Sequence, residues 1–348
     1  MAAQGPPGTI EVVDERPASG RPKVSLVVAM RNERDAIERC IASLFAQSYP
    51  AERLEILVYD GASTDGSREI VERVLDGHSN GRLRQNPGII QAAAWNLGIS
   101  EATGDVIGIV SGHAELSHEY VSAAVAALEQ TGAWMVGGPV TAVGEGLVGE
   151  AVAMATSTPF GVGNARHHYA RTAMDVDAVF MGVCRAETYR RFRFDESMVR
   201  DQDDELGYRI LDAGGRIVCD PAIRSTYHSR ATLPGLWRQY FAYGYWKVRV
   251  FRRHPRQVRL RQLVPSAFVL ALIATTVSAP FSFMGRFGLA VVAGSYVLGD
   301  LVASVLAARN RRWHLLPVLS VVFATLHLAY GLGVLRGTTA LFRRSGTR

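Results

Sequence analysis

The run Asp201-Gln202-Asp203-Asp204-Glu205 places four acidic side chains within five consecutive positions. Because neighbouring carboxylates oppose each other's ionisation, at least one of them should have a raised pKa, which suits a general base. The alternative is the solvated start of a helix, where the helix dipole favours acids. That alternative fits Asp204 and Glu205 well and Asp201 moderately, so the residues alone leave both interpretations open.

Further polar residues stand directly after apolar runs. Asp60 ends one such run, and Ser111 and His113 follow another. In open α/β sheets, ligands bind beyond the carboxyl ends of the strands, so these residues are expected to lie near one ligand site and to indicate an enzyme. Asp65 has a second explanation, because aspartate is common in turns and at helix caps.

The elements that must position these residues alternate between strand and helix. Short β-rich runs are typical of buried parallel strands, and the helical segments between them are short crossovers. This alternation predicts an α/β domain built on a doubly wound, mainly parallel sheet. The strands are expected at 24–30, 55–60, 105–110, 134–137 and 217–219, and the helices at 36–47, 67–75, 88–101, 117–131 and 203–213.

The net charge of +6 could indicate nucleic-acid binding, but the position of the charge favours a membrane. The densest basic stretch comes directly before a long apolar region, where arginines suit anionic lipid headgroups. The sequence shows no nucleic-acid-binding motif of the usual kinds. That basic stretch consists of Arg249, Arg252, Arg253, Arg256, Arg259 and Arg261.

Three apolar stretches follow, at about 263–283, 287–308 and 314–335, and only Asp300 interrupts them with a charge. Each approaches the ~20 residues needed to span a bilayer. The alternative is a buried helical core domain. Basic clusters lie before the first stretch, between the last two and after the third, and three full spans would put the last cluster outside. The sequence therefore predicts two to three spans.

The cysteines Cys40, Cys184 and Cys219 form neither a disulfide framework nor a metal-binding spacing. The N-terminus has no apolar core of the kind found in signal peptides, so we expect a cytoplasmic catalytic domain on a multi-pass membrane protein. The expected divisions are a disordered tail at 1–21, a catalytic domain at 22–235, an amphipathic interfacial segment at 236–262, transmembrane helices at 263–335 and a basic tail at 336–348.

Several segments together resemble the family 2 glycosyltransferases of GT-A fold. They are Val24–Glu33, the loop Asp60-Gly61-Ala62-Ser63-Thr64-Asp65-Gly66, Gln91–Gly98 with Gly104–Ile107, and Arg200–Leu206. The resemblance covers roughly 22–255 and is greatest to the succinoglycan-type glucosyltransferases, the ExoA-like group, which also have hydrophobic C-terminal helices. The loop combined with the later acidic run is more specific than either motif alone.

The resemblance implies a nucleotide-sugar site. Ala29, Arg31 and Glu33 would line the nucleoside pocket, and Asp60 would accept a charge-assisted hydrogen bond from the base. An alternative explanation for Glu33 is an acid at a helix N-terminus. The resemblance also implies that Asp203 is the catalytic base, which takes the proton of the acceptor hydroxyl.

The segment Ser111-Gly112-His113-Ala114 occupies the place of the family's metal-binding Asp-x-Asp motif, and both aspartates are absent. The charge of a leaving nucleoside diphosphate is usually neutralised by Mg²⁺ or Mn²⁺. Imidazole suits Mn²⁺ better than Mg²⁺, so His113 is a candidate metal ligand, with Glu115 in reach to assist. Alternatively, His113 donates a hydrogen bond to the diphosphate, and both roles stay open.

The segment Arg238–Lys247 lies where processive relatives have a Gln-x-x-Arg-Trp motif, which this chain lacks. We therefore expect addition of a single sugar. The segment is instead typical of an interfacial amphipathic helix. Its Arg238 and Lys247, together with Asp204 and His228, are weaker candidates for contact with the acceptor or the diphosphate.

The expected protein is thus an inverting glycosyltransferase. It would move a sugar, most simply glucose from UDP-glucose, to a polyprenyl-diphosphate-linked saccharide in exopolysaccharide or cell-envelope synthesis. Its partners would be the UDP-sugar donor, this lipid-linked acceptor and membrane lipids, with no nucleic acid. The alternatives are a mannosyl- or galactosyltransferase of the same fold, and a non-catalytic membrane scaffold with a decayed GT-A domain.

Overall fold

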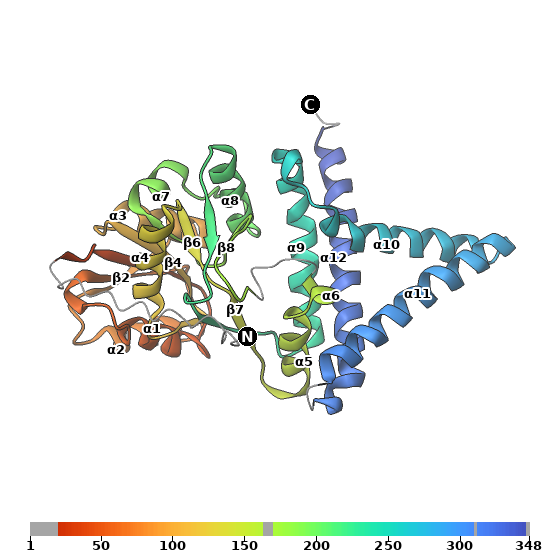
Figure 1. Ribbon diagram of the computed structural model, residues 1–348, viewed down its shortest axis with the longest axis horizontal. Coiled ribbons are helices and arrows are strands. Elements are labelled where there is room, and N and C mark those ends of the chain that lie inside the picture. The colour runs from red at the N-terminus through yellow and green to blue at the C-terminus, as the bar shows by residue number, and fades with distance from the viewer. Residues whose placement is uncertain (1–19, 163–169, 310–311, 346–348) are drawn as a thin grey trace, which may run out of the picture.

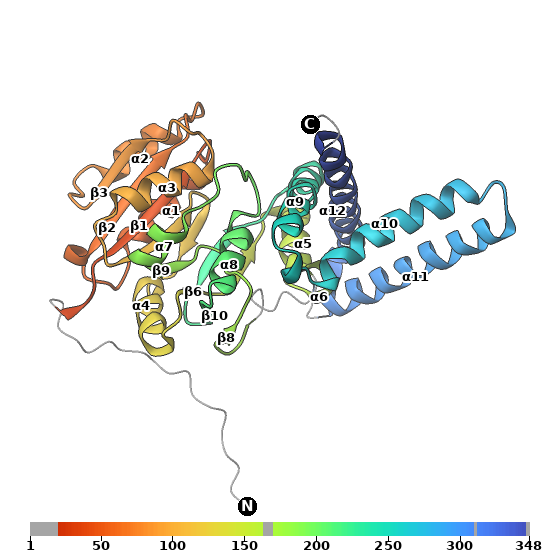
Figure 2. The same ribbon diagram turned by 90° about the horizontal axis from the view of Figure 1, so that it is seen from above.

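The computed structural model describes residues 20–162, 170–309 and 312–345. The predicted N-terminal tail lies outside these residues except at its last positions, as do residues 346–348 of the predicted basic tail. An α/β domain lies on one side of the molecule and long helices on the other (Figure 1). Seen from above, the α/β domain and the long helices again lie on opposite sides (Figure 2).

The central sheet has eight strands in the order β3-β2-β1-β4-β9-β6-β10-β8. Its parallel core is β3-β2-β1-β4, which confirms the doubly wound, mainly parallel sheet. The antiparallel β9, which pairs with both β4 and β6, was not predicted. The bounds are β1 Val24–Met30, β2 Leu54–Asp60, β3 Gly81–Gln85, β4 Val106–Ser111, β6 Met135–Gly137, β8 Met174–Asp175, β9 Val183–Arg185 and β10 Ile217–Cys219.

Helices cover both faces of this sheet, because the side chains of its buried strands alternate between two cores. In β1, Leu26 and Val28 pack towards one face, and Val27 and Ala29 pack towards the other. The first face is covered by α1 (Ile37–Phe45), α2 (Ser67–Leu75) and α4 (Tyr120–Thr131), and the second by α3 (Gln91–Glu101), α7 (Ala186–Phe192) and α8 (Gln202–Asp212).

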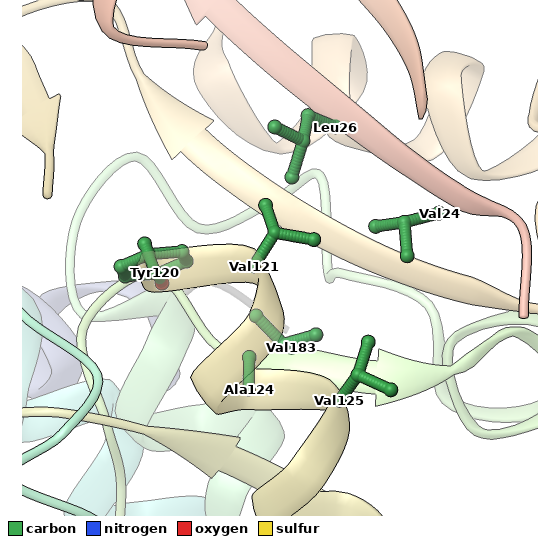
Figure 3. Close-up of a pocket in the computed structure, with 7 residues that line it drawn as sticks. All are labelled: Val24, Leu26, Tyr120, Val121, Ala124, Val125 and Val183. Carbon is green, nitrogen blue, oxygen red and sulfur yellow. The ribbon is translucent and has the colours of Figure 1, made fainter. Parts of the chain in front are cut away.

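A small gap lies between β1 and α4 (Figure 3). Its lining is apolar apart from the hydroxyl of Tyr120, which donates a hydrogen bond to the carbonyl oxygen of Met181 at 2.7 Å. The gap has no room for a water molecule. It is therefore part of the packed core and not a ligand site. The lining residues are Val24, Leu26, Tyr120, Val121, Ala124, Val125 and Val183.

A second, three-stranded sheet joins distant parts of the chain. Its order is β5 (Ala114–Leu116), β11 (Ser225–His228) and β7 (Val140–Val143), with β11 antiparallel to β5 and parallel to β7. The pairing sets Thr226 opposite Glu115. The chain that follows His113 therefore lies beside the strand that ends at His228.

The long helices begin with α9 (Leu233–Arg253), which lies beside α12 (Leu316–Ser345) in both views (Figures 1 and 2). Helices α10 (Leu260–Ser278) and α11 (Phe283–Ala308) form a hairpin that projects away from the α/β domain (Figure 2). The shorter α5 (Gly146–Thr156) and α6 (Pro159–Val162) pack on α12. Single 3₁₀ turns occur at Ala51–Arg53, Pro255–Gln257 and Trp313–Leu315.

Within the described residues, three helices are long and apolar enough to cross a membrane, at Leu260–Ser278, Phe283–Ala308 and Trp313–Leu341. These spans agree with the three predicted apolar stretches. The loop between the first two helices lies at 279–282, a few residues earlier than predicted. Most side chains of α10 and α11 are exposed and many of them are large and apolar, which suits contact with lipid. The three helices together indicate a membrane protein.

Candidate active site

The carboxyl ends of β2, β1 and β4 meet at one edge of the sheet, which we call the donor edge because the nucleotide-sugar donor is predicted from the sequence to bind there. The parallel register places Met30 beside Asp60 and Ala29 beside Ser111. The carbonyl oxygen of Ala29 accepts a hydrogen bond from the amide of Gly112 at 3.0 Å. The structure therefore brings Ala29, Asp60 and Ser111 together, and the nearby Arg31 is exposed.

Two loops interlock above this edge. The amide of Asn32 donates to Oγ of Ser63 at 2.9 Å, and Oδ1 of Asn32 accepts from the amide of Thr64 at 2.9 Å. Asn32 has a φ of 55°, a left-handed conformation that asparagine tolerates better than most residues. These reciprocal bonds fix the loop after β1 against the loop after β2.

Asp60 is 1% exposed and stabilises its own loop. Its Oδ1 accepts from the amide and the hydroxyl of Ser63, at 3.0 and 2.6 Å. Its Oδ2 lies 3.7 Å from the guanidinium of Arg68. Ser111 is also buried, and its Oγ accepts from the side-chain amide of Gln91 at 2.9 Å.

Asp65 acts as a turn and capping residue. Its Oδ1 accepts from the amide and the hydroxyl of Ser67, and its Oδ2 accepts from the amide of Arg34 at 3.1 Å. Burial raises the pKa of Asp65, but the bonds from Ser67 and from the Arg34 amide outweigh it and lower that pKa overall. The geometry therefore agrees with the capping explanation of this residue.

Glu33 and His113 form a pair, with Oε1 of Glu33 2.9 Å from Nδ1 of His113. Each side chain is about one-quarter exposed, at 26% and 25%. A carboxylate that accepts from Nδ1 fixes the ring and leaves Nε2 available as a ligand or a donor. The ring of Tyr227 packs edge-on against His113 at 5.3 Å between centroids. Glu33 therefore supports His113, a contact that the sequence did not reveal.

A second carboxylate–imidazole pair lies in the three-stranded sheet. Oε1 of Glu115 is 2.7 Å from Nε2 of His228 and 2.9 Å from Nε of Arg39. Burial raises the pKa of Glu115, but these two partners outweigh it and lower the pKa overall. His113 and His228 are thus each held by a carboxylate. The part of the chain that the structure describes holds no group of three acidic, histidine or cysteine side chains placed for a metal.

The acidic run begins α8 and forms the acidic edge of the site. Asp201 is the N-cap residue of this helix, with a φ of 59°. Lys247 of α9 lies 2.7 Å from Oδ1 of Asp201 and also bonds Asp204, and Glu205 pairs with Arg209 at 2.8 Å. Within the three described ranges, Asp203 alone of these acids has no hydrogen-bond or ion-pair partner.

Asp203 also has an unusual protonation equilibrium. Burial, together with the charges of Asp204 and Asp201, raises the pKa of Asp203 to about 7, although Lys247 opposes this shift. Glu205 forms an ion pair with Arg209, and Asp201 and Asp204 both contact Lys247. Of the two interpretations of the acidic run, the helix-start explanation thus fits its neighbours, while Asp203 has the properties of a base.

Lys247 is 6% exposed and lies between two carboxylates, so the structure does not leave it free for the acceptor or the diphosphate. Arg238, on the same helix, is exposed. The intervening Gln239 donates to the hydroxyls of Tyr227 and Tyr243, both at 2.9 Å. Helix α9 therefore connects the His113 side of the site with the acidic edge, a connection that sequence reasoning missed.

Residues 25–196 match the family model described as glycosyl transferase family 2. The chain therefore contains a family 2 glycosyltransferase domain and is a glycosyltransferase. The succinoglycan biosynthesis protein ExoA of Rhizobium meliloti is 29% identical over 92% of this glycosyltransferase and 96% of its own length.

A second relative comes from Methanococcus voltae. This dolichyl N-acetyl-alpha-D-glucosaminyl phosphate 3-beta-D-2,3-diacetamido-2,3-dideoxy-beta-D-glucuronosyltransferase is 24% identical, over 91% of the glycosyltransferase and 98% of its own length. Among solved structures, the mannosyltransferase PcManGT from Pyrobaculum calidifontis, in complex with GDP-Man and Mn²⁺, has a TM-score of 0.59 at 17% identity. The match covers 93% of this chain and 91% of PcManGT, which confirms the GT-A fold.

The glycosyltransferase therefore has two edges with different chemistry. The donor edge offers a buried carboxylate, an exposed arginine and a histidine held by an acid. The acidic edge offers one carboxylate that is half ionised near neutral pH and surrounded by acids that are already paired. A base of this kind is best placed to take a proton when its pKa lies near the working pH.

Proposed function

We propose that this glycosyltransferase inverts the anomeric centre as it moves one sugar from a nucleotide donor to an acceptor hydroxyl. Asp203 accepts the proton of that hydroxyl, the acceptor oxygen bonds to the anomeric carbon, and the bond from that carbon to the diphosphate oxygen breaks. The electron pair leaves with the nucleoside diphosphate. The unpartnered Asp203, with its raised pKa, is the observation on which this proposal rests.

The donor is a UDP-sugar, most simply UDP-glucose. Asp60 accepts from the base, Ala29 and Arg31 border the nucleoside, and Glu33 acts through His113. A pocket of this kind selects the nucleotide more strongly than the hexose, so mannose and galactose are the rival sugars. ExoA, which matches 92% of the chain, is named for succinoglycan biosynthesis, and this supports a role in polysaccharide synthesis.

A divalent ion, Mn²⁺ or Mg²⁺, fits the residues present if the diphosphate supplies most of its ligands. His113 with its Glu33 support would contribute one nitrogen, which suits Mn²⁺ better than Mg²⁺. When bound, such an ion neutralises the charge that develops on the leaving diphosphate. PcManGT, which shares the fold, was solved with Mn²⁺.

The acceptor is a lipid-linked saccharide, in the simplest case a polyprenyl diphosphate, at the cytoplasmic face of the cell membrane. Two features support this choice. Three helices that adjoin the catalytic domain are long and apolar enough to cross a membrane. A relative that matches 91% of the chain is named for transfer to a dolichyl phosphate sugar. Arg238, which is exposed on α9, would bind a phosphate of the acceptor.

The test is incubation of membranes that contain the full chain with a panel of labelled UDP- and GDP-sugars and a lipid extract. We expect label from UDP-glucose in the lipid fraction and no transfer from GDP-sugars. Transfer only from UDP-galactose, or only from GDP-mannose, would identify that nucleotide sugar as the donor in place of UDP-glucose. A non-catalytic scaffold would give no transfer and no heat of UDP binding by titration calorimetry, with or without Mn²⁺.

A further inference from the structure

We propose that Lys247 is a positioning residue for the acidic edge, through which the membrane-associated helices hold the catalytic carboxylate in place. The proposal rests on the proposed role of Asp203 as the base. Lys247 is an unusual lysine, because it is 6% exposed and its ammonium contacts Asp201 at 2.7 Å and also contacts Asp204. Buried charges are kept in proteins when they are paired in this way.

The pairing belongs to a longer row of contacts between α9 and the segment 195–212. Nearly two turns beyond Lys247, Arg253 pairs with Asp195, and the next residue, His254, lies 3.2 Å from Asp212. Arg249 donates to the carbonyl oxygen of Ser197 at 3.2 Å. Beyond the helix, Arg259 pairs with Asp177 at 2.8 Å. The basic stretch predicted to face lipid headgroups therefore contacts the catalytic domain with several of its members.

The other side of α9 is fixed to α12. A side chain added at Gly244 would collide with the carbonyl oxygen of Tyr330. On α12, additions at Gly333 and Gly337 would collide with the carbonyl oxygens of Phe241 and Tyr245. Glycines at such crossings allow two backbones to approach closely, as in helix pairs of membrane proteins. Gly244 lies about one turn before Lys247, so the lysine projects from a part of α9 where the backbone of α12 approaches closely.

Lys247 controls Asp203 through charge as well as through position. The ammonium offsets part of the negative charge of Asp201 and Asp204, the two neighbours that oppose ionisation of Asp203. Further titratable or charged groups near this cluster among the described residues include Arg200, which adjoins Asp201, Glu205 with Arg209 on α8, and His254, which lies 3.5 Å from Glu205. The phenols of Tyr189, Tyr208, Tyr243 and Tyr330 also face it. Removal of the ammonium should therefore make Asp203 harder to ionise, with no direct effect on donor binding.

The experiment compares Lys247→Met with Arg252→Met in the full chain, reconstituted in nanodiscs, with the donor found active in the panel. Arg252 is an exposed cation on the same helix and serves as the matched control. We expect Lys247→Met to shift the midpoint of the kcat–pH profile up by about one unit, which lowers kcat about tenfold below the midpoint. The rates should converge at high pH, and UDP affinity should be unchanged.

A second variant should shift the midpoint of the kcat–pH profile in the opposite direction. It can be measured even if Lys247→Met does not fold. Asp204→Asn removes a negative neighbour, so the midpoint should fall below that of the unaltered protein. The proposal is overturned if Lys247→Met matches Arg252→Met, or if the rate of Lys247→Met falls equally at every pH together with UDP affinity. If Lys247→Met does not fold, an unmoved or raised midpoint in Asp204→Asn overturns it.

The proposed function is tested separately from the positioning role of Lys247. Retention of full transfer by Asp203→Asn would remove the base assignment whatever the Lys247 variant does. A normal loss in Asp203→Asn with an unmoved profile in the other two variants would leave the function intact and reject only the positioning role.

Discussion

The donor edge and the acidic edge of this glycosyltransferase are built in different ways. At the donor edge, short polar side chains bond to the backbone of one neighbouring loop, as Asn32 and Ser63 do. At the acidic edge, Asp204 bonds Lys247, 43 residues further along the chain. The donor edge is thus organised by the catalytic domain itself, whereas the acidic edge also depends on α9 and on the helices beneath it.

In the proposed mechanism, this difference would separate donor binding from sugar transfer. Donor binding should persist whenever the α/β domain is folded, because its loops hold each other. Transfer should also require α9 to be seated between α12 and α8. An enzyme arranged in this way can bind nucleotide away from its membrane context and still transfer little. The predictions below test each edge in turn.

The largest effect is expected for Asp203→Asn. An amide cannot take the acceptor's proton, so kcat should fall by about 10²–10⁴, the usual contribution of a general base. UDP affinity should stay within about twofold, because Asp203 has no contact with the donor edge among the described residues. Rates from labelled transfer and affinities from calorimetry measure the two quantities. A parallel collapse of UDP affinity would show that the two edges are not independent.

A smaller effect, about 10–100-fold in donor or metal affinity, is expected for Glu33→Gln. The amide is a weaker partner for Nδ1 of His113, so the ring is less firmly oriented, as for other partners of metal-binding histidines. The pH profile of kcat should keep its midpoint. Asp35→Asn is the control, since Asp35 is an exposed acid in the same loop. Equal behaviour of the two variants would remove Glu33 from the site.

The unaltered enzyme should show a rise of kcat with pH. A base works in its deprotonated form, and the pKa of Asp203 is raised to about 7. The rate should therefore increase about tenfold per unit below pH 7 and level off above it. A profile that is flat between pH 5 and 9 would contradict this assignment. Asp65 at the donor edge has a lowered pKa and stays ionised throughout this range, so it does not contribute to the profile.

The parts of the fold that could be predicted from the sequence are those with local signals. Buried strands such as 24–30, the loop from Asp60 to Gly66 and the three apolar stretches all appear as patterns within a short window. The pairing of β5 with β11 could not be predicted, because the contact of Glu115 with His228 joins positions 113 residues apart through strands of only a few residues. Nothing near Lys247 in the sequence indicates that its partners are Asp201 and Asp204.

The smallest effect is expected for Asp65→Ala, which removes acceptors for Ser67 and for the Arg34 amide. Loss of a capping side chain typically lowers the free energy of unfolding by about 0.5–2 kcal/mol. The melting temperature should therefore fall by a few degrees, about 2–4 °C per kcal/mol for a domain of this size. KM for the donor should change less than twofold, because the other bonds between the two loops remain. A tenfold rise in KM with an unchanged melting temperature would make Asp65 a donor ligand. The donor edge would then depend on a side chain that the present geometry uses only to hold its loops together.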